Sequence, residues 1–325
     1  MNILIYPIVF TVSVIITILI ENKLIPILTK KAKQPIYSEG PSWHLNKSGT
    51  PTMGGVAMLF STTIVLSLYV ILTFGNGNKE IAISTLICLI FSLGNGLIGV
   101  FDDVMKLLKR RNDGLTPAQK LLLQGLLAAI FLMARRKFLS DSSVINFSLF
   151  EIDLGLLYYP ISFIIILGIV NCANLTDGVD GLCSSVALVI SAFISLAFAT
   201  VSNEISVIGL TLAGCCIGFI YFNINPARIF MGDTGSLFIG AVIVSLFFFI
   251  KNPLLAIPFS IVYVIEGISV IIQVAVYKIT SRRVFKMAPL HHHLEKCGVS
   301  ENRICIIAII ATFISSLIAF TLIKI

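Results

Sequence analysis

The sequence predicts an all-α polytopic membrane protein of about ten transmembrane helices, and three observations support this prediction. The mean hydropathy is +1.00 and only 12% of the 325 residues are charged, whereas a soluble domain carries about 25%. Long apolar runs occur from one end of the chain to the other. These runs are continuous rather than alternating, which is typical of membrane helices and not of a transmembrane β-barrel.

A helix needs about 20 apolar residues to cross the hydrocarbon core, and ten segments approach this length. The first lacks the basic flank and the cleavage site of a signal peptide, so we expect it to be a membrane span. The expected spans are 3–28, 55–74, 81–101, 118–134, 158–173, 181–200, 205–222, 235–250, 254–277 and 303–325. Segment 142–157 alternates weakly and predicts a short hairpin. We expect the whole chain, 1–325, to form one integral membrane domain.

The distribution of Lys and Arg predicts the orientation in the membrane. Ten spans place both termini on the same side. Most of the 23 basic residues lie in loops that follow odd-numbered spans, so these loops are expected to face the cytoplasm and both termini the outside. Only the cluster Arg135–Lys137 conflicts with this count. Because the net charge of +7 follows the same loops, topology explains it better than nucleic-acid binding does.

Five polar clusters interrupt the apolar pattern, and the charge count places all five on the cytoplasmic side. The first, HLNKSGTPTMGG at 44–55, contains glycines and Lys47, which suit phosphate, although a turn-rich loop has the same composition. The second, FDDVMK, places Asp102 and Asp103 at a membrane boundary, with Lys106 one helical turn from Asp102. An acidic pair can bind Mg²⁺ or accept a proton, but a solvated helix end with one ion pair fits equally well.

The third cluster, at 171–181, carries Asn174, Asp177 and Asp180 among glycines. Such hard oxygen ligands suit Mg²⁺–phosphate or a nucleoside. A structural linker could have a similar composition, but it would not need these three residues together. The fourth, FNINPARIFMGDTGS, holds Asp233 between two glycines, which suits either close approach to a ligand or a capped turn.

The fifth cluster, MAPLHHHLE, contains three consecutive histidines, which are His291, His292 and His293. Consecutive side chains point in different directions, so we expect phosphate contact or proton transfer rather than a zinc site. Glu266 and Gln273 lie within the ninth expected span. A functional role and an interhelical hydrogen bond are equally compatible with Glu266.

The motifs TPTMGG, FDDVMK, NLTDGVDG, FNINPA, MGDTGS and PLHHHLE, in this order, resemble the polyprenyl-phosphate N-acetylhexosamine-1-phosphate transferase superfamily over essentially the whole chain. The unbroken HHH followed by LE favours its muramoyl branch. The resemblance implies a ten-helix, Mg²⁺-dependent enzyme of the bacterial plasma membrane with its active site facing the cytoplasm. It would transfer phospho-MurNAc-pentapeptide from UDP-MurNAc-pentapeptide to undecaprenyl phosphate and release lipid I and UMP. A homodimer is also implied.

The resemblance further implies catalytic roles for Asp102, Asp103, Asp233 and His291, with Mg²⁺ at Asp233. The implied substrate-binding residues are Lys47, Thr52, Lys106, Lys120, Asn174, Asp177, Asp180, Asn223, Phe230, Gln273, His292 and His293. We expect Asp102 to remove a proton from the acceptor phosphate, which then attacks the donor directly; a two-step route through a carboxylate nucleophile is the alternative.

Two other functions are compatible with parts of the pattern. One keeps the chemistry and changes the donor to UDP-N-acetylglucosamine. The other is a membrane transporter, but transporters place their sites near the midplane and often contain repeats, whereas these polar clusters lie at one rim and the sequence shows no repeat.

Overall fold

The computed structural model describes residues 4–31, 47, 49–109, 114–139 and 142–323, and within them the protein is a bundle of helices with one small hairpin. The elements are α1 (Ile5–Lys31), α2 (Gly55–Gly75), α3 (Lys79–Lys109), α4 (Pro117–Leu139), β1 (Val144–Asn146), β2 (Glu151–Asp153), η2 (Gly155–Leu157), α5 (Tyr158–Thr176), α6 (Leu182–Ala197), α7 (Asn203–Asn223), α8 (Gly232–Phe249), η3 (Pro253–Leu255), α9 (Ala256–Phe259), α10 (Ile261–Thr280), α11 (Leu290–Lys296) and α12 (Glu301–Phe320).

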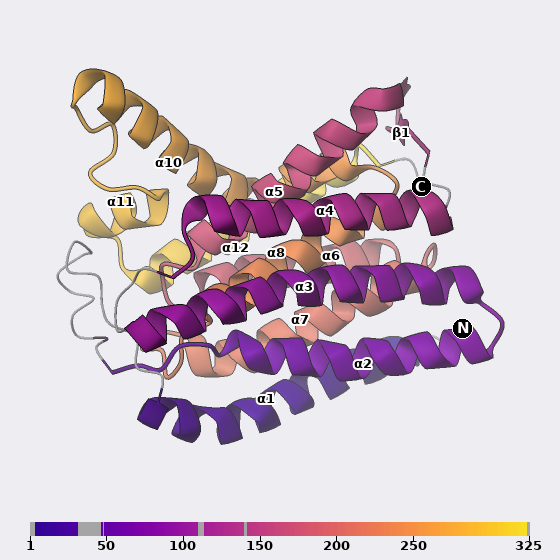
Figure 1. The fold of residues 1–325 in the computed structure, drawn as a ribbon, viewed down its shortest axis with the longest axis horizontal. Helices are drawn as coiled ribbons and strands as arrows, with labels where there is room; N and C mark the ends of the chain where they lie inside the picture. Colours follow the sequence, from indigo (N-terminus) through magenta and orange to yellow (C-terminus); the bar gives the residue numbers. More distant parts are fainter. Residues whose placement is uncertain (1–3, 32–46, 48, 110–113, 140–141, 324–325) are drawn as a thin grey trace.

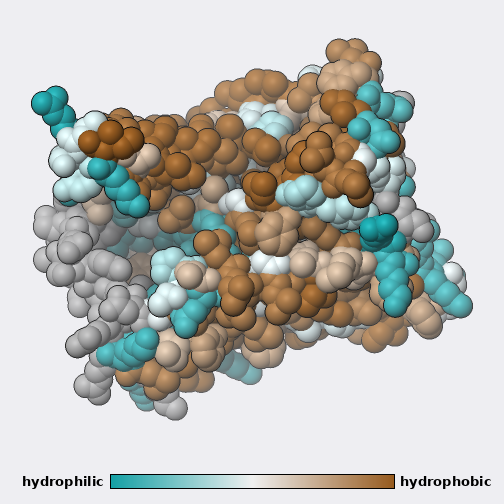
Figure 2. Space-filling view, turned by 45° about the horizontal axis from the view of Figure 1, so that its top comes forward, coloured by the Kyte–Doolittle hydropathy of each residue, from teal (hydrophilic) through white to brown (hydrophobic). Residues whose placement is uncertain are grey.

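Nine of the described helices are long and apolar enough to cross a membrane, and each corresponds to a predicted span. The remaining predicted span, 181–200, is the shorter helix α6 of 16 residues, which buries most of its length against α7 and α12. Figure 2 shows a broadly hydrophobic surface, with hydrophilic residues gathered mainly toward the two ends of the molecule. The chain is therefore an all-α polytopic membrane protein, as predicted.

Two differences from the predicted spans affect the residues of the polar clusters. The run 254–277 was expected to be one span, but the structure divides it into η3, α9 and α10. Pro258 has no backbone N–H to continue a helical ladder, and Ser260 leaves helical geometry at φ −99° and ψ 30°. The third span was expected to end at residue 101, but α3 continues to Lys109. The acidic pair therefore lies within this helix, as the predicted i, i+4 pairing of Asp102 with Lys106 requires.

The predicted hairpin is present near the end of the molecule that carries both chain termini (Figure 1). Strands β1 and β2 are antiparallel, with Ile145 opposite Ile152. The backbone N–H of Ser148 donates to the carbonyl oxygen of Leu322 at 3.0 Å. The connection between the two strands is thus fastened to the segment that follows α12.

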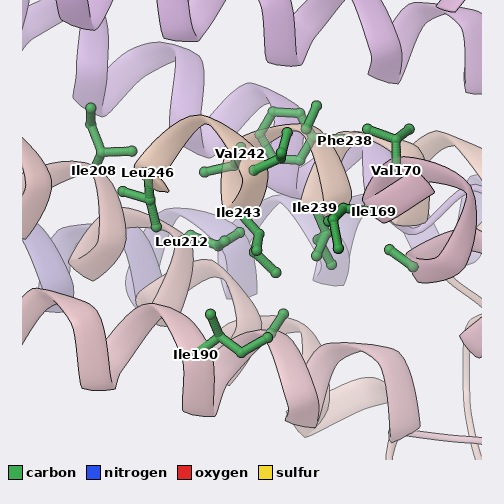
Figure 3. Close-up of a cluster of buried hydrophobic side chains, with 14 of the residues drawn as sticks. Ile169, Val170, Ile190, Ile208, Leu212, Phe238, Ile239, Val242, Ile243 and Leu246 are labelled. Carbon is green, nitrogen blue, oxygen red and sulfur yellow. The ribbon is translucent and has the colours of Figure 1, made fainter. Parts of the chain in front are cut away.

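Helix α8 forms the centre of the bundle and is buried along most of its length against α3, α5 and α2. Figure 3 shows its apolar side chains packed between those of α5, α6 and α7. Glycines permit the closest approaches of α2 and α3 to α8. A Cβ on Gly55 would lie 2.2 Å from the Cα of Gly235, and one on Gly99 would lie 2.2 Å from the carbonyl oxygen of Asp233. The start of α8 is therefore held tightly by α2 and α3.

The other end of α8 is bound by a buried arginine from α4. Arg135 is 3% exposed, and its Nη2 donates to the carbonyl oxygen of Phe248 at 2.8 Å. Its guanidinium also lies 5.5 Å from the centroid of the Phe248 ring. A cation here satisfies a carbonyl in the last turn of α8 and complements the helix dipole. The conflict that Arg135 creates in the charge count therefore has a structural reason, because this residue is a packing element rather than a loop charge.

Candidate active site

Three carboxylates and two lysines meet where α3, α4 and α8 come together. Ligand oxygens of Asp102, Asp103 and Asp233 all lie within 4.8 Å of one another. The Nζ of Lys106 is 2.7 Å from Oδ2 of Asp102 and 3.0 Å from Oδ2 of Asp233. Lys120 also forms an ion pair with Asp233, and its Nζ is 3.5 Å from Oδ2 of Asp102. The predicted i, i+4 pair is present, and Lys120 joins it from the next helix.

The two neighbouring aspartates of α3 face different groups. Both oxygens of Asp103 accept hydrogen bonds from the first turn of α8, from the N–H of Asp233 at 3.2 Å and from the N–H and hydroxyl of Thr234 at 3.0 and 2.7 Å. Asp103 thus satisfies free donors at the N-terminus of α8. Asp102 accepts one backbone bond, from the N–H of Leu115 at 2.8 Å, and turns its Oδ2 toward the lysines.

The donor set of this cluster fits a divalent cation. Carboxylate oxygens are the hard ligands that Mg²⁺ prefers, and three carboxylates exceed the two neighbouring lysines in charge. Both oxygens of Asp103 are bound by the first turn of α8, whereas Oδ2 of Asp233 and Oδ2 of Asp102 face lysine side chains, so Asp233 and Asp102 are the more available members of the cluster. The sequence motifs pointed to Mg²⁺ at Asp233 and to metal binding or proton transfer at the acidic pair, and the structure brings the three carboxylates together as one candidate metal cluster.

Asn174, at the end of α5, connects the third predicted cluster to this site. Its Nδ2 donates to Oδ1 of Asp233 and to Oγ of Ser236, each at 2.9 Å. Asp177 follows in the adjoining loop. Burial raises the pKa of Asp177 well above its usual range, and the negative charges of Asp233 and Asp103 add to this effect. The third cluster therefore adds a further acid whose charge is disfavoured by its surroundings.

A second ionic network contains Lys47, Asp180 and Glu301. The Nζ of Lys47 is 2.8 Å from Oδ1 of Asp180 and 2.7 Å from Oε2 of Glu301. The other oxygen of Asp180 accepts from Nδ2 of Asn225 and from the N–H of Ala227, both at 3.0 Å. Burial alone would lower the pKa of Lys47, but its two carboxylate partners raise it above the usual value. In this structure Lys47 therefore pairs with Asp180 and not with Asp233.

Backbone hydrogen bonds bring the first and fourth clusters together. The N–H of Phe230 donates to the carbonyl of Pro51 at 2.8 Å, and the N–H of Gly54 donates to the carbonyl of Phe230 at 2.9 Å. Thr52 is buried between them. A Cβ on Gly232 would lie 3.0 Å from Oγ1 of Thr52 and 2.5 Å from Oδ2 of Asp103. Thr52 thus borders the carboxylate cluster, while residues 44–46 and 48 of its motif lie outside the described residues.

Asn223 connects the third and fourth clusters through the backbone. Its Oδ1 accepts from the N–H of Gly181 at 2.9 Å, and its Nδ2 donates to the carbonyl of Ile229 at 2.8 Å. Asn223 is buried. Its side-chain amide therefore braces two loops of the site.

The three consecutive histidines have three different partners. Nδ1 of His291 lies 3.1 Å from Oε2 of Glu266, and Nδ1 of His292 lies 2.7 Å from Oε2 of Glu295. Nδ1 of His293 accepts the N–H of Lys286 at 3.0 Å. Each ring is therefore oriented by its own contact.

Gln273 of α10 holds the segment that leads to these histidines. Its Oε1 accepts the N–H groups of Val284 and Phe285 at 3.1 and 2.9 Å. Gln273 was expected to contact substrate, and here its amide contacts the backbone.

The structure also brings into the site several residues that the sequence motifs do not single out. Glu301 follows Ser300 at the start of α12 and has the signature of an ordinary acidic residue in a first helical turn. Its contact with Lys47 joins segments far apart in the chain, which no local signal indicates. The other residues in this group are Thr234, Ser236, Asn225 and Glu295.

Comparisons with known proteins give one consistent result. Residues 85–251 match the family model for glycosyl transferase family 4, and residues 47–59 match signature 1 of phospho-N-acetylmuramoyl-pentapeptide-transferase. Relatives with that name include one from Clostridium perfringens strain SM101, 39% identical over 311 residues that cover 95% of this chain and 94% of the relative. One from Clostridioides difficile strain 630 is 41% identical over 321 residues, covering 95% and 96%. One from Bacillus mycoides strain KBAB4 is 40% identical over 298 residues, covering 91% and 90%.

Proposed function

This chain belongs to the phospho-N-acetylmuramoyl-pentapeptide-transferase family, and on that premise we propose that it transfers phospho-MurNAc-pentapeptide from UDP-MurNAc-pentapeptide to undecaprenyl phosphate. The products are lipid I and UMP. The observation that carries the proposal is the cluster of Asp102, Asp103 and Asp233 with Lys106 and Lys120 at the junction of three membrane helices. Such a cluster suits phosphoryl transfer, in which catalysis is mostly positioning and charge stabilisation.

In the proposed reaction an oxygen of the acceptor phosphate attacks the β-phosphorus of the donor. A new P–O bond forms there, the bond from that phosphorus to the bridging oxygen breaks, and UMP leaves with the bonding electrons. The second pKa of a phosphate is about 6, so the acceptor needs little activation. Asp102 takes the residual proton, because its Oδ2 faces the cluster rather than a helix terminus.

Lys106 and Lys120 stabilise the negative charge that develops during transfer. Both ammonium groups lie at Asp233, and Lys106 also contacts Asp102. Positive groups fixed in place before the reaction need no reorganisation, which is why such contacts are effective in catalysis. Asp103 keeps the start of α8, and hence Asp233, in place.

We propose Mg²⁺ as the cation, held by Asp233. When bound, Mg²⁺ supplies charge neutralisation for the donor pyrophosphate. The Lys47–Asp180 network and the neighbouring Phe230 are proposed to contact the uridine half of the donor, next to Asn174 and Asp177. Thr52, Asn223, Gln273 and the three histidines complete the proposed site from surrounding loops.

The layout suits one soluble substrate and one lipid substrate. We propose that the whole chain acts as one transferase domain in the bacterial plasma membrane, with the site facing the cytoplasm, where the nucleotide donor is made. The acceptor reaches the site from the bilayer, between helices. A homodimer is the proposed assembly.

The first experiment measures UMP and lipid product from purified protein, undecaprenyl phosphate, Mg²⁺ and UDP-MurNAc-pentapeptide. We expect lipid I from wild type and none from Asp233→Ala. Asp153→Ala is the matched control, because Asp153 is an exposed acid of the hairpin, and it should retain activity. Reaction with UDP-N-acetylglucosamine instead would show that the proposed donor is wrong, and ion movement without UMP release would favour a transporter.

A donor-only reaction separates the direct route from the two-step route. If the acceptor attacks directly, omission of undecaprenyl phosphate abolishes UMP release. A burst of about one UMP per protein without acceptor would reveal a covalent intermediate and contradict the direct route.

A further inference from the structure

Glu266 of α10 makes three close contacts to a single residue of α11. The N–H of His291 lies 3.1 Å from both Oε1 and Oε2 of Glu266, and Nδ1 of His291 lies 3.1 Å from Oε2. Both residues are buried, with Glu266 5% and His291 0% exposed. One carboxylate therefore binds both the backbone and the ring of the same histidine.

These contacts favour one tautomer of the neutral His291 ring. An ionised carboxylate only accepts hydrogen bonds, so Nδ1 of His291 is the donor. The lone pair of the neutral ring is then on Nε2. Among the described residues, Nε2 of His291 is buried and has no hydrogen-bond partner, so it is available to another group.

The free nitrogen points to the loop between α5 and α6. A Cβ built on Gly178 would lie 2.2 Å from Nε2 of His291. Any larger residue there would displace the ring. The space at Gly178 therefore admits the imidazole beside Asp177 and Asp180, which the proposed function places at the donor.

Gln273 provides a useful contrast on the same helix. It lies seven residues after Glu266, about two helical turns, and binds only the backbone of Val284 and Phe285. Both side chains fasten the segment after α10 back onto that helix, but only Glu266 contacts an imidazole. Gln273 therefore holds the loop, whereas Glu266 holds it and also orients the ring of His291.

We propose that Glu266 is a positioning residue that acts through His291. It fixes the ring orientation and the tautomer with hydrogen on Nδ1, so that Nε2 faces the site as an acceptor. A carboxylate that orients a functional histidine in this way is a recurring arrangement in enzymes. The proposal rests on the proposed function only in giving His291 a role in transfer.

The direct test is a spectroscopic readout of the tautomer. The full chain is labelled with ¹⁵N-histidine and studied in lipid nanodiscs; the four histidines are assigned with His291→Ala. We expect wild type to show His291 with hydrogen on Nδ1 and Glu266→Gln to lose this preference. Ser269→Ala removes a buried hydrogen bond to the backbone carbonyl of Glu266 but leaves the Glu266 carboxylate in place, so it should match wild type. Hydrogen on Nε2 in wild type, or an unchanged spectrum in Glu266→Gln, would overturn the proposal.

Activity supplies the second readout. We expect Glu266→Gln to lower kcat/KM about ten- to hundred-fold, the size of effect seen when the partner of a functional histidine is removed. In a His291→Ala background, Glu266→Gln should cause no further loss of kcat/KM. Ser269→Ala should remain active. Independent, multiplying effects of Glu266→Gln and His291→Ala would contradict action through the ring.

The test also allows for a Glu266→Gln variant that does not fold and for a wild type that forms no lipid product. If Glu266→Gln does not fold, Gly178→Ala tests the same ring from its other side, and we expect a changed His291 spectrum with lower kcat/KM. Unchanged values for both would count against the proposal. If wild type forms no lipid product, the proposed function fails, while the tautomer measurement still decides the role of Glu266.

Discussion

Neighbouring acids in this protein have different roles because their carboxylates face different groups. Asp102 and Asp103 are adjacent in sequence, yet one faces two lysines and the other binds the first turn of α8. A motif such as FDDVMK shows that two acids are present, but the helix that each one faces decides what it does.

The first prediction separates these two roles. Asp103→Asn replaces one accepting oxygen by a donor that meets backbone N–H groups, so we expect a loss of about 1–2 kcal/mol in unfolding free energy together with reduced transfer. Asp102→Asn should abolish most transfer with a smaller loss of stability. Thermal unfolding in detergent, measured beside UMP release, checks both. A larger stability loss for Asp102→Asn would contradict the assignment.

The second prediction concerns pH and Asp177. Its pKa is raised by burial and by Asp233 and Asp103, so the folded protein retains this proton at a pH where the unfolded chain has lost it. The resulting stability is fully present below the unfolded pKa of about 3.9 and is lost as the pH rises through the folded pKa. Relative to wild type, Asp177→Asn should therefore gain unfolding free energy between pH 5 and pH 8. Denaturation curves at the two pH values measure this, and a constant difference would refute it.

At the level of elements, α8 is stabilised at both ends by residues from other helices. Asp103 of α3 binds its first turn and Arg135 of α4 binds its last. An acid at the N-terminus and a base at the C-terminus both complement the helix dipole. The helix that carries Asp233 is thus fixed both at the end beside the carboxylate cluster and at the opposite end.

The third prediction tests the far end of α8. Arg135→Ala removes the charged donor to the buried Phe248 carbonyl, which keeps its bond from the N–H of Lys251, and it also removes the ring contacts, so we expect a loss of about 2–4 kcal/mol in unfolding free energy. The neighbouring Arg136→Ala is the control: Arg136 is exposed and contacts the ring of Tyr159, and it should cost less than about 1 kcal/mol. Thermal unfolding of both variants decides, and equal losses would show that the buried contact is unimportant.

The fourth prediction uses the two ends of α2. Gly55→Ala places a methyl group against the backbone of Gly235, and such overpacking costs about 1–3 kcal/mol. It should also reduce transfer, because the start of α8 must shift. Gly75→Ala, at the other end of α2, has no neighbouring atom within 4 Å and should be nearly neutral. A stable, fully active Gly55→Ala variant would show that the close approach is not required.

At the level of the whole molecule, the orientation in the membrane is predicted by the distribution of Lys and Arg. The contacts within the protein do not determine it. The structure places the chain ends and the hairpin at one end, and the end of α3 with its acids at the other (Figure 1). The Lys and Arg count assigns the second end to the cytoplasm, which remains a prediction.

The fifth prediction tests that assignment with a natural reporter. The structure describes all seven cysteines, and among them only Cys297, just after α11, is exposed. A membrane-impermeant maleimide should label it in inverted vesicles and not in intact cells. Leu149→Cys in a Cys297→Ser background should behave in the opposite way, since Leu149 is 89% exposed between the hairpin strands. Labelling of Cys297 from outside would reverse the orientation.

The sequence predicted the spans well because every backbone polar group in lipid must be satisfied within its own helix, which makes long apolar runs unambiguous. It also predicted the hairpin and the pairing of Lys106 with Asp102, which are local. It did not predict the break near Ser260, the partner of Lys47, or the contact between Glu266 and His291. The last two depend on residues that meet only when distant segments fold together, so no local periodicity encodes them.

The burial of α8 also constrains how the protein is made. During synthesis α2, α3 and α5 emerge first, and the surfaces that will enclose α8 have no protein partner until residues 232–249 leave the ribosome. Until then those surfaces must be covered by lipid or by the insertion machinery. Asp233 arrives with the same helix that fills this space. The centre of the bundle is therefore filled and the carboxylate cluster is completed in the same event, so a nascent chain that stops short of α8 has neither a filled centre nor the complete cluster.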